Sequence, residues 1–129
     1  MIIIGHPWIE SKRFCTITTQ EELTASTAEE VVLLEPLNKS YTLAHYCKKN
    51  MITFAVKVDT LTEALFSNAL GASYIICEAD IAKQIQPIAQ EYLFDTRILV
   101  PIDDENEIEK LAHASIDGVI FREVIQDDI

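Results

Sequence analysis

The chain has 129 residues, 49% of them hydrophobic, and carries a formal net charge of −11 at pH 7. This length predicts a single domain that can bury a proper core. The acidic balance would repel nucleic acid and anionic membranes, and Lys12-Arg13 and Lys48-Lys49 are only pairs rather than a basic cluster, so we expect neither partner.

The first 30 residues form the least regular part of the sequence. Short strands are predicted at Ile2–Ile4, which is stopped by Gly5 and Pro7, and at 14–17. A brief helix should follow, capped by Thr18 or Thr19 and with acidic residues in its first turn. We treat residues 1–30 as an irregular N-terminal segment of the single domain 1–129.

Residues 31–123 alternate between apolar runs and amphipathic segments, which predicts regular βα repeats. Strands are expected at 31–34, 52–58, 73–77, 97–102 and 118–121. Four helices should connect them, with starts at Ser40, at the Thr60–Glu63 capping box, at Asp80 and at Asp104–Glu107. Gly71 should stop the second of these helices, Pro87 should kink or split the third, and Pro101 should break the strand 97–102 near its end.

This alternation predicts an α/β domain in three layers, with a mostly parallel sheet of five to six strands. The favoured architecture is a doubly wound, flavodoxin-like sheet, and the alternative is a partial β/α barrel. The last unit, Ile98 to Phe121, combines a strand, acidic residues, a helix and the run IDGVIF. It resembles the end of a phosphodiesterase-type or aldolase-type barrel. The catalytic motifs of those families are absent, so the resemblance implies a scaffold and no activity.

Catalogued functional motifs are absent from the sequence. Only three glycines occur, Gly5, Gly71 and Gly118, which excludes G-x-G-x-x-G and the P-loop. Neither H-E-x-x-H nor G-x-S-x-G is present. No two histidines have the spacing of metal ligands, so no cofactor is assigned and no metal site is predicted from histidine.

Charged side chains follow each of the five regular strands. In parallel sheets ligands bind beyond the carboxyl ends of the strands, and the candidates there are Glu35, Lys57, Asp59, Glu78, Asp103 and Arg122. The carboxylates could hold an oxygen-seeking ion such as Mg²⁺. Alternatively, Lys57 and Arg122 could receive a small anionic ligand.

The same residues also have a purely structural interpretation. Asp59, Asp80, Asp103 and Asp104 precede helices, where acids cap free N–H groups, and this is their favoured explanation. Lys57 is the most informative residue, because a lysine between Val56 and Val58 needs a partner if it is buried. We expect it to pair with Glu35, Glu78 or both.

Two functions remain open. The favoured one is a non-catalytic α/β protein that forms a homo-oligomer, at least a dimer, or binds a protein partner, because Phe66, Ala69 or Leu70 is left over once the helix 61–70 has covered the sheet. The alternative is a small-molecule or Mg²⁺-dependent enzyme or binder that uses the acidic strand ends with Lys57 and Arg122.

The cysteines and the N-terminus bear on the compartment. Cys15, Cys47 and Cys77 are widely spaced, without a C-x-x-C motif, which favours a reducing environment without disulfides. No stretch approaches the ~18 apolar residues of a membrane span, and residues 1–8 lack the basic region of a signal peptide. We therefore expect a cytoplasmic protein.

Overall fold

The computed structural model describes residues 1–126, and in this part of the chain eight parallel strands form one sheet. Their order across the sheet is β1-β7-β6-β5-β4-β3-β2-β8. The strands are β1 (Ile2–Ile4), β2 (Arg13–Thr16), β3 (Glu30–Leu34), β4 (Phe54–Lys57), β5 (Tyr74–Ile76), β6 (Arg97–Ile102), β7 (Gly118–Phe121) and β8 (Ile125–Gln126). The helices are α1 (Gln20–Ala25), α2 (Leu37–Lys49), α3 (Leu61–Ala69), α4 (Ala79–Glu91) and α5 (Ile108–His113), with short 3₁₀ turns η1 (Glu105–Glu107) and η2 (Arg122–Val124).

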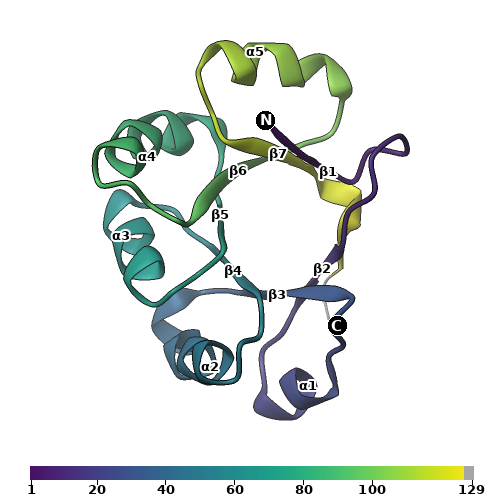
Figure 1. Cartoon of the computed structure of the whole chain (residues 1–129), viewed down its shortest axis with the longest axis vertical. Coiled ribbons are helices and arrows are strands. Elements are labelled where there is room, and N and C mark those ends of the chain that lie inside the picture. The colour runs from purple at the N-terminus through teal and green to yellow at the C-terminus, as the bar shows by residue number, and fades with distance from the viewer. Residues whose placement is uncertain (127–129) are drawn as a thin grey trace.

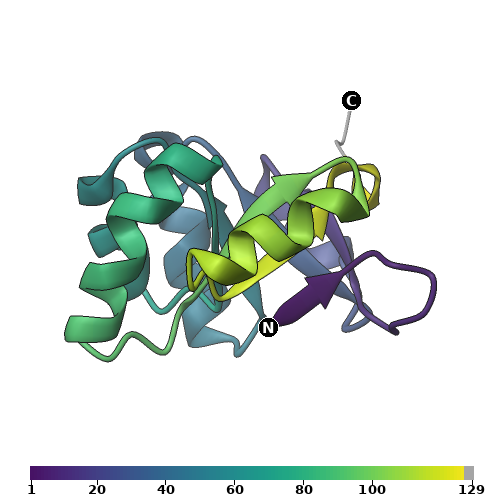
Figure 2. The same ribbon diagram turned by 90° about the horizontal axis from the view of Figure 1, so that it is seen from above.

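The sheet is strongly curled. Seen along its axis, the strands follow one another around a ring, and the five helices lie outside it (Figure 1). The view from above shows α3, α4 and α5 packed around the outer side of the strands (Figure 2). The domain therefore has the shape of a half-barrel, with a convex face covered by helices and a concave face.

Each face has its own hydrophobic core. The larger cluster joins outward strand residues such as Val32, Val56 and Ile98 to helix residues such as Ala44 and Ile85. The smaller cluster draws its fully buried members from strands alone and lies on the concave face, with the members Ile4, Phe14, Val31, Leu33, Ala55, Ile76, Leu99 and Ile120. Because side chains alternate between the two faces of a strand, adjacent residues such as Ala55 and Val56 belong to different cores.

Several predicted helix caps, turns and strand bounds are confirmed. The Thr60 hydroxyl accepts a hydrogen bond from the backbone N–H of Glu63 at 3.1 Å and caps α3, and Thr19 caps α1 in the same way. Gly71 follows α3 with a φ of +92°, a conformation that favours glycine. Strands β6 and β7 have the predicted bounds.

The strand count is a correction: the α/β class and the parallel sheet are confirmed, but the sheet has eight strands instead of five to six. Residues 31–121 do supply five strands and four helices, as predicted. The additional strands β1, β2 and β8 have only three, four and two residues. The short strands predicted at 2–4 and 14–17 are therefore present as β1 and β2, the second shifted by one residue, but runs this short carry too little periodicity to be assigned firmly to the sheet.

Two predicted helix starts are also wrong. Helix α2 begins at Leu37, and Ser40 lies inside its first turn, where its hydroxyl donates to the Pro36 carbonyl at 2.8 Å. Helix α4 begins at Ala79, so Asp80 lies in the first turn and does not cap it. In both cases the chain turns into the helix directly after the strand end, before the residue with the better capping side chain.

Neither Pro87 nor Pro101 ends its element, so the predicted split of the helix and the predicted break of the strand are wrong. Helix α4 continues through Pro87. Pro87 lies on the exposed side of the helix, so water can hydrogen-bond to the backbone carbonyl that lacks an N–H donor because of the proline. Strand β6 continues through Pro101. The Leu99 carbonyl points toward β5 and accepts from the backbone N–H of Cys77, which follows the end of that strand. The backbone nitrogen of Pro101, two residues later, points to the same side, where β5 has already ended. The missing N–H therefore costs no ladder hydrogen bond.

The three cysteines are free thiols. Among residues 1–126, no helix has the length and apolar character needed to cross a membrane.

Candidate functional site

A pocket of about 230 Å³ lies at the carboxyl end of the strands, on the concave side of the sheet. Four of the six candidate residues line it, namely Glu35, Lys57, Glu78 and Arg122. The remaining lining residues are apolar: Leu33, Ile76, Pro101 and Ile125. We call this pocket and its rim the mouth of the half-barrel.

The two-residue period of the strands places these side chains. Lys57 follows Ala55 by two positions and is therefore directed to the same concave face. The same step leads from Leu33 to Glu35 and from Ile76 to Glu78. Each strand thus presents an apolar side chain to the concave core and a charged one at the level where the pocket opens.

Lys57 pairs with Glu35, one of the two partners expected from the sequence. Its Nζ lies 3.8 Å from the Glu35 Oε2, and the Lys57 side chain is 49% exposed. The lysine is not enclosed by covering helices, because it lies on the concave face while the helices lie on the convex one. A pair this exposed contributes little to stability, typically below ~1 kcal/mol.

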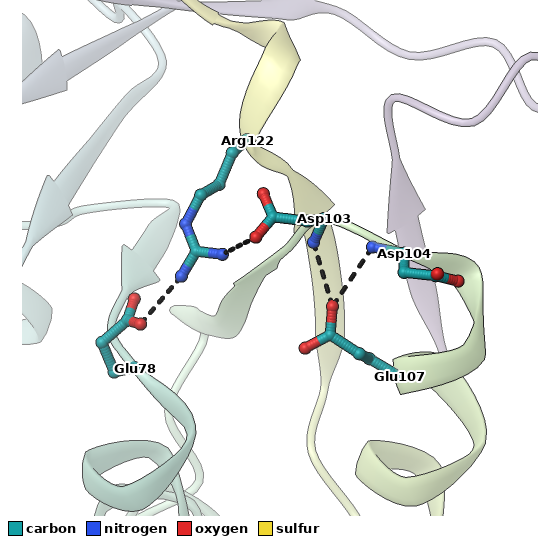
Figure 3. Close-up of polar contacts among 5 residues, drawn as sticks. All are labelled: Glu78, Asp103, Asp104, Glu107 and Arg122. Atoms are coloured by element: carbon teal, nitrogen blue, oxygen red, sulfur yellow. Dashed lines mark hydrogen bonds and ion pairs between the residues drawn. The ribbon is translucent and has the colours of Figure 1, made fainter.

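Arg122 joins two neighbouring strand ends. Its Nη2 donates to Glu78 Oε1 and its Nη1 donates to Asp103 Oδ2, both at 2.8 Å. Figure 3 shows the guanidinium lying between the two carboxylates, which come from the start of α4 and the end of β6. Arg122 therefore fixes the rim of the mouth over β5, β6 and β7.

The backbone of Asp103 is bound by Glu107, a residue of the capping box that starts η1. The Glu107 carboxylate accepts from the backbone N–H groups of Asp103 and Asp104 at 3.0 and 3.2 Å (Figure 3). The Asp104 side chain accepts from the backbone N–H of Asn106 and caps η1. The capping role predicted for Asp104 is confirmed. Asp103 does not cap with its side chain, which binds Arg122 instead.

Asp59 is placed differently from the other candidates. It is exposed and does not belong to the described residues that line the pocket. Its backbone N–H donates to the Glu63 carboxylate at 2.9 Å, which completes the capping of α3. The side chain that caps α3 is that of Thr60, so the capping role predicted for Asp59 is wrong.

Metal-ligating side chains are not gathered at the mouth. Among residues 1–126, no group of three or more His, Cys, Asp or Glu side chains is arranged to hold a metal ion. Two of the three rim carboxylates, Glu78 and Asp103, already face the Arg122 guanidinium, which would repel a divalent cation.

Cys77 lies next to Glu78 but is no nucleophile for this pocket. It is buried in the convex core. Burial, followed by the charges of Glu78 and Asp80, raises the pKa of the Cys77 thiol to about 12. The thiol therefore stays protonated at neutral pH, and the reactive form is the thiolate.

The sequence analysis missed two parts of this region. Counting back two residues from Glu35, Glu78 and Asp103 would have found three of the four apolar lining residues, Leu33, Ile76 and Pro101, but not Ile125. His6 was not linked to particular residues, yet its ring centroid lies 5.9 Å from that of Phe121 and its Nε2 lies 3.7 Å from Glu105. No local signal links His6 to these residues, because their contact depends on the pairing of β1 with β7.

Comparison with known proteins adds no relative: no protein-family model and no curated protein matches the chain.

Proposed function

We propose that the protein binds a small polar molecule in the mouth of the half-barrel. The observation that carries this proposal is the convergence of Glu35, Lys57, Glu78 and Arg122, from four different strand ends, on one apolar-floored pocket. Clefts with an apolar lining and a few convergent polar groups are the usual form of ligand sites. The carboxyl end of parallel strands is also where α/β folds place such sites.

The fold supports this proposal. Of the two architectures considered from the sequence, we favour the partial β/α barrel, because the labelled helices gather on the outer side of the curl (Figure 1). A curled sheet brings the strand ends toward a common centre, whereas a flat sheet would spread them in a row. The approach of Arg122 on η2 to Glu78 beyond β5 is a direct consequence of the curl.

A thermal-shift panel tests the proposal. Wild type and Lys57→Met are heated with inorganic phosphate, small carboxylates, amino acids, polyols and Mg²⁺. A ligand present at about 100 times its Kd stabilises the folded state by about 2.7 kcal/mol, which is a shift of several degrees. We expect at least one compound to stabilise the wild type and to lose this effect in Lys57→Met.

Lys83→Met is the matched control, because Lys83 is an exposed lysine on α4, on the outer side of the sheet. It should respond to the panel as the wild type does. If no compound stabilises the wild type, or if both lysine variants lose the response equally, the mouth is not the site.

A second candidate function is self-association through the face formed by α2 and α3. A groove on this face is lined by Leu37, Tyr41, Phe66, Leu70 and their neighbours. The sequence left Phe66 without cover, and its side chain is indeed 60% exposed, with Tyr41 at 53%. We propose a second copy as the occupant, because the exposed Phe66 lines the groove, so that two copies related by a twofold axis would each cover the Phe66 of the other.

Light scattering over a hundredfold range of protein concentration tests this candidate. We expect a mass of at least twice 14.6 kDa at micromolar concentration, and a monomer for Phe66→Ser. A wild type that stays monomeric over the whole range contradicts self-association and leaves the ligand proposal unaffected.

A further inference from the structure

The charges that line the mouth alternate in sign. Going around the sheet from β3 to β7, the pocket presents Glu35, Lys57, Glu78 and Arg122, which are negative, positive, negative and positive. Two acids and two bases sum to zero. Asp103, on the rim beside Arg122, adds one further negative charge.

This pattern disfavours ligands of a single sign. An anion would meet three carboxylates, while both terminal nitrogens of Arg122 already donate at 2.8 Å to Glu78 and Asp103. A simple cation would meet Lys57 and the same guanidinium. Burying an unpaired charge in a pocket is costly, so the best complement is a molecule that carries both signs.

Lys57 has the spare capacity to bind the anionic end. Its ammonium group has three N–H donors, and its distance of 3.8 Å to Glu35 exceeds the 2.7–3.2 Å range of a hydrogen bond. A ligand carboxylate can therefore approach Lys57 without displacing a strong bond. The Glu35 carboxylate beside it remains able to accept from a ligand ammonium group.

The floor and the size of the pocket limit the rest of the molecule. Leu33, Ile76, Pro101 and Ile125 give the pocket an apolar surface beside its charged side chains, and the sheet register places Ile76 next to Lys57. The volume of about 230 Å³ lies below the range of roughly 300–1,000 Å³ typical of sites for drug-sized ligands. A short aliphatic side chain fits this floor.

From these features we infer that the ligand of the mouth is a small zwitterion of the α-amino-acid type with an apolar side chain. Its carboxylate pairs with Lys57, its ammonium group pairs with Glu35, and its side chain covers the apolar floor. The inference rests on the proposed function, since it specifies the ligand class of the same pocket.

Titration calorimetry with three probes of the same shape tests the inference. L-leucine carries both charges, isoamylamine lacks the carboxylate, and isocaproate lacks the ammonium group. We expect leucine to bind the wild type and each singly charged analogue to bind about tenfold more weakly or worse, a factor that corresponds to about 1.4 kcal/mol. Lys57→Met should bind leucine only as weakly as the wild type binds isoamylamine. Lys83→Met should bind all three probes with wild-type affinity.

Two further probes separate the failure of this inference from the failure of the proposed function. Inorganic phosphate and sorbitol represent an anionic and a neutral polar ligand. If either binds in a Lys57-dependent manner while leucine does not, the mouth is a ligand site but the zwitterion is wrong. Equal binding of leucine and isocaproate also overturns the inference, and binding of no probe at all contradicts the inference and weakens the proposed function with it.

Discussion

The two faces of the curled sheet differ in what their side chains do. The convex face is sealed by helices and contains the larger core, in which Val56 and Ile98 have no exposed surface. The concave face has a smaller core built mainly from strand residues, and at its carboxyl end apolar side chains give way to exposed ion pairs. The convex face therefore holds the larger share of the buried apolar side chains, whereas the concave face ends in a charged rim, which is where we propose the ligand site.

Adjacent residues of β4 give the largest contrast between the faces. Val56 is buried on the convex face, and Lys57 is half exposed at the mouth. Val56→Ala should lower the free energy of unfolding by about 1–3 kcal/mol, through lost burial and the cavity left behind. Lys57→Met should change it by less than about 0.5 kcal/mol. Urea denaturation measures both values, and equal costs at the two positions would contradict the contrast.

Arg122 should give a smaller effect that depends on salt. Arg122→Met removes the cation between Glu78 and Asp103 and leaves two carboxylates facing each other. All three side chains are substantially exposed, so the loss should stay within about 1 kcal/mol. It should shrink further in high salt, where charges are screened. The loss of stability caused by Val56→Ala should not depend on salt in this way. A loss for Arg122→Met that is also independent of salt would show that Arg122 stabilises the protein through packing rather than through its charge.

The reactivity of the three cysteines tests how tightly the convex core is packed, without any substitution. Cys47 and Cys77 lie in the convex core, where burial raises their thiol pKa values to about 11 and about 12. Cys15 is only partly buried on β2. At pH 8 a thiol reagent should label Cys15 first and should reach the other two only as fast as the protein opens. Rapid labelling of Cys77 in the native protein would show that the convex core is looser than described.

The regular part of the fold could be predicted because its signals are local. The capping box Thr60–Glu63, the stop at Gly71 and the apolar runs of β6 and β7 each act within a few residues. The curl of the sheet has no such signal. It arises from the joint packing of eight strands. Two of them, β1 and β2, were predicted only as short isolated strands, and β8 has only two residues.

The candidate site could also be predicted only in part from the sequence. Parallel strands end on the same side, so the gathering of Glu35, Lys57, Glu78 and Arg122 follows from the strand assignment. The pairing of Arg122 with Glu78 and Asp103 does not follow, because it depends on how far the sheet curls. For Asp103 the sequence therefore favoured a helix cap over the strand-end site, whereas its side chain binds Arg122 at the rim.

The central claim, that the mouth binds a small polar molecule, is tested most directly by amide chemical-shift mapping with a library of small polar compounds. We predict shifts for at least one compound at Glu35, Lys57, Glu78 and Arg122, with these shifts lost in Lys57→Met and retained in Lys83→Met. Shifts confined to the α2–α3 groove, or no shifts at the mouth with any compound, would contradict the account.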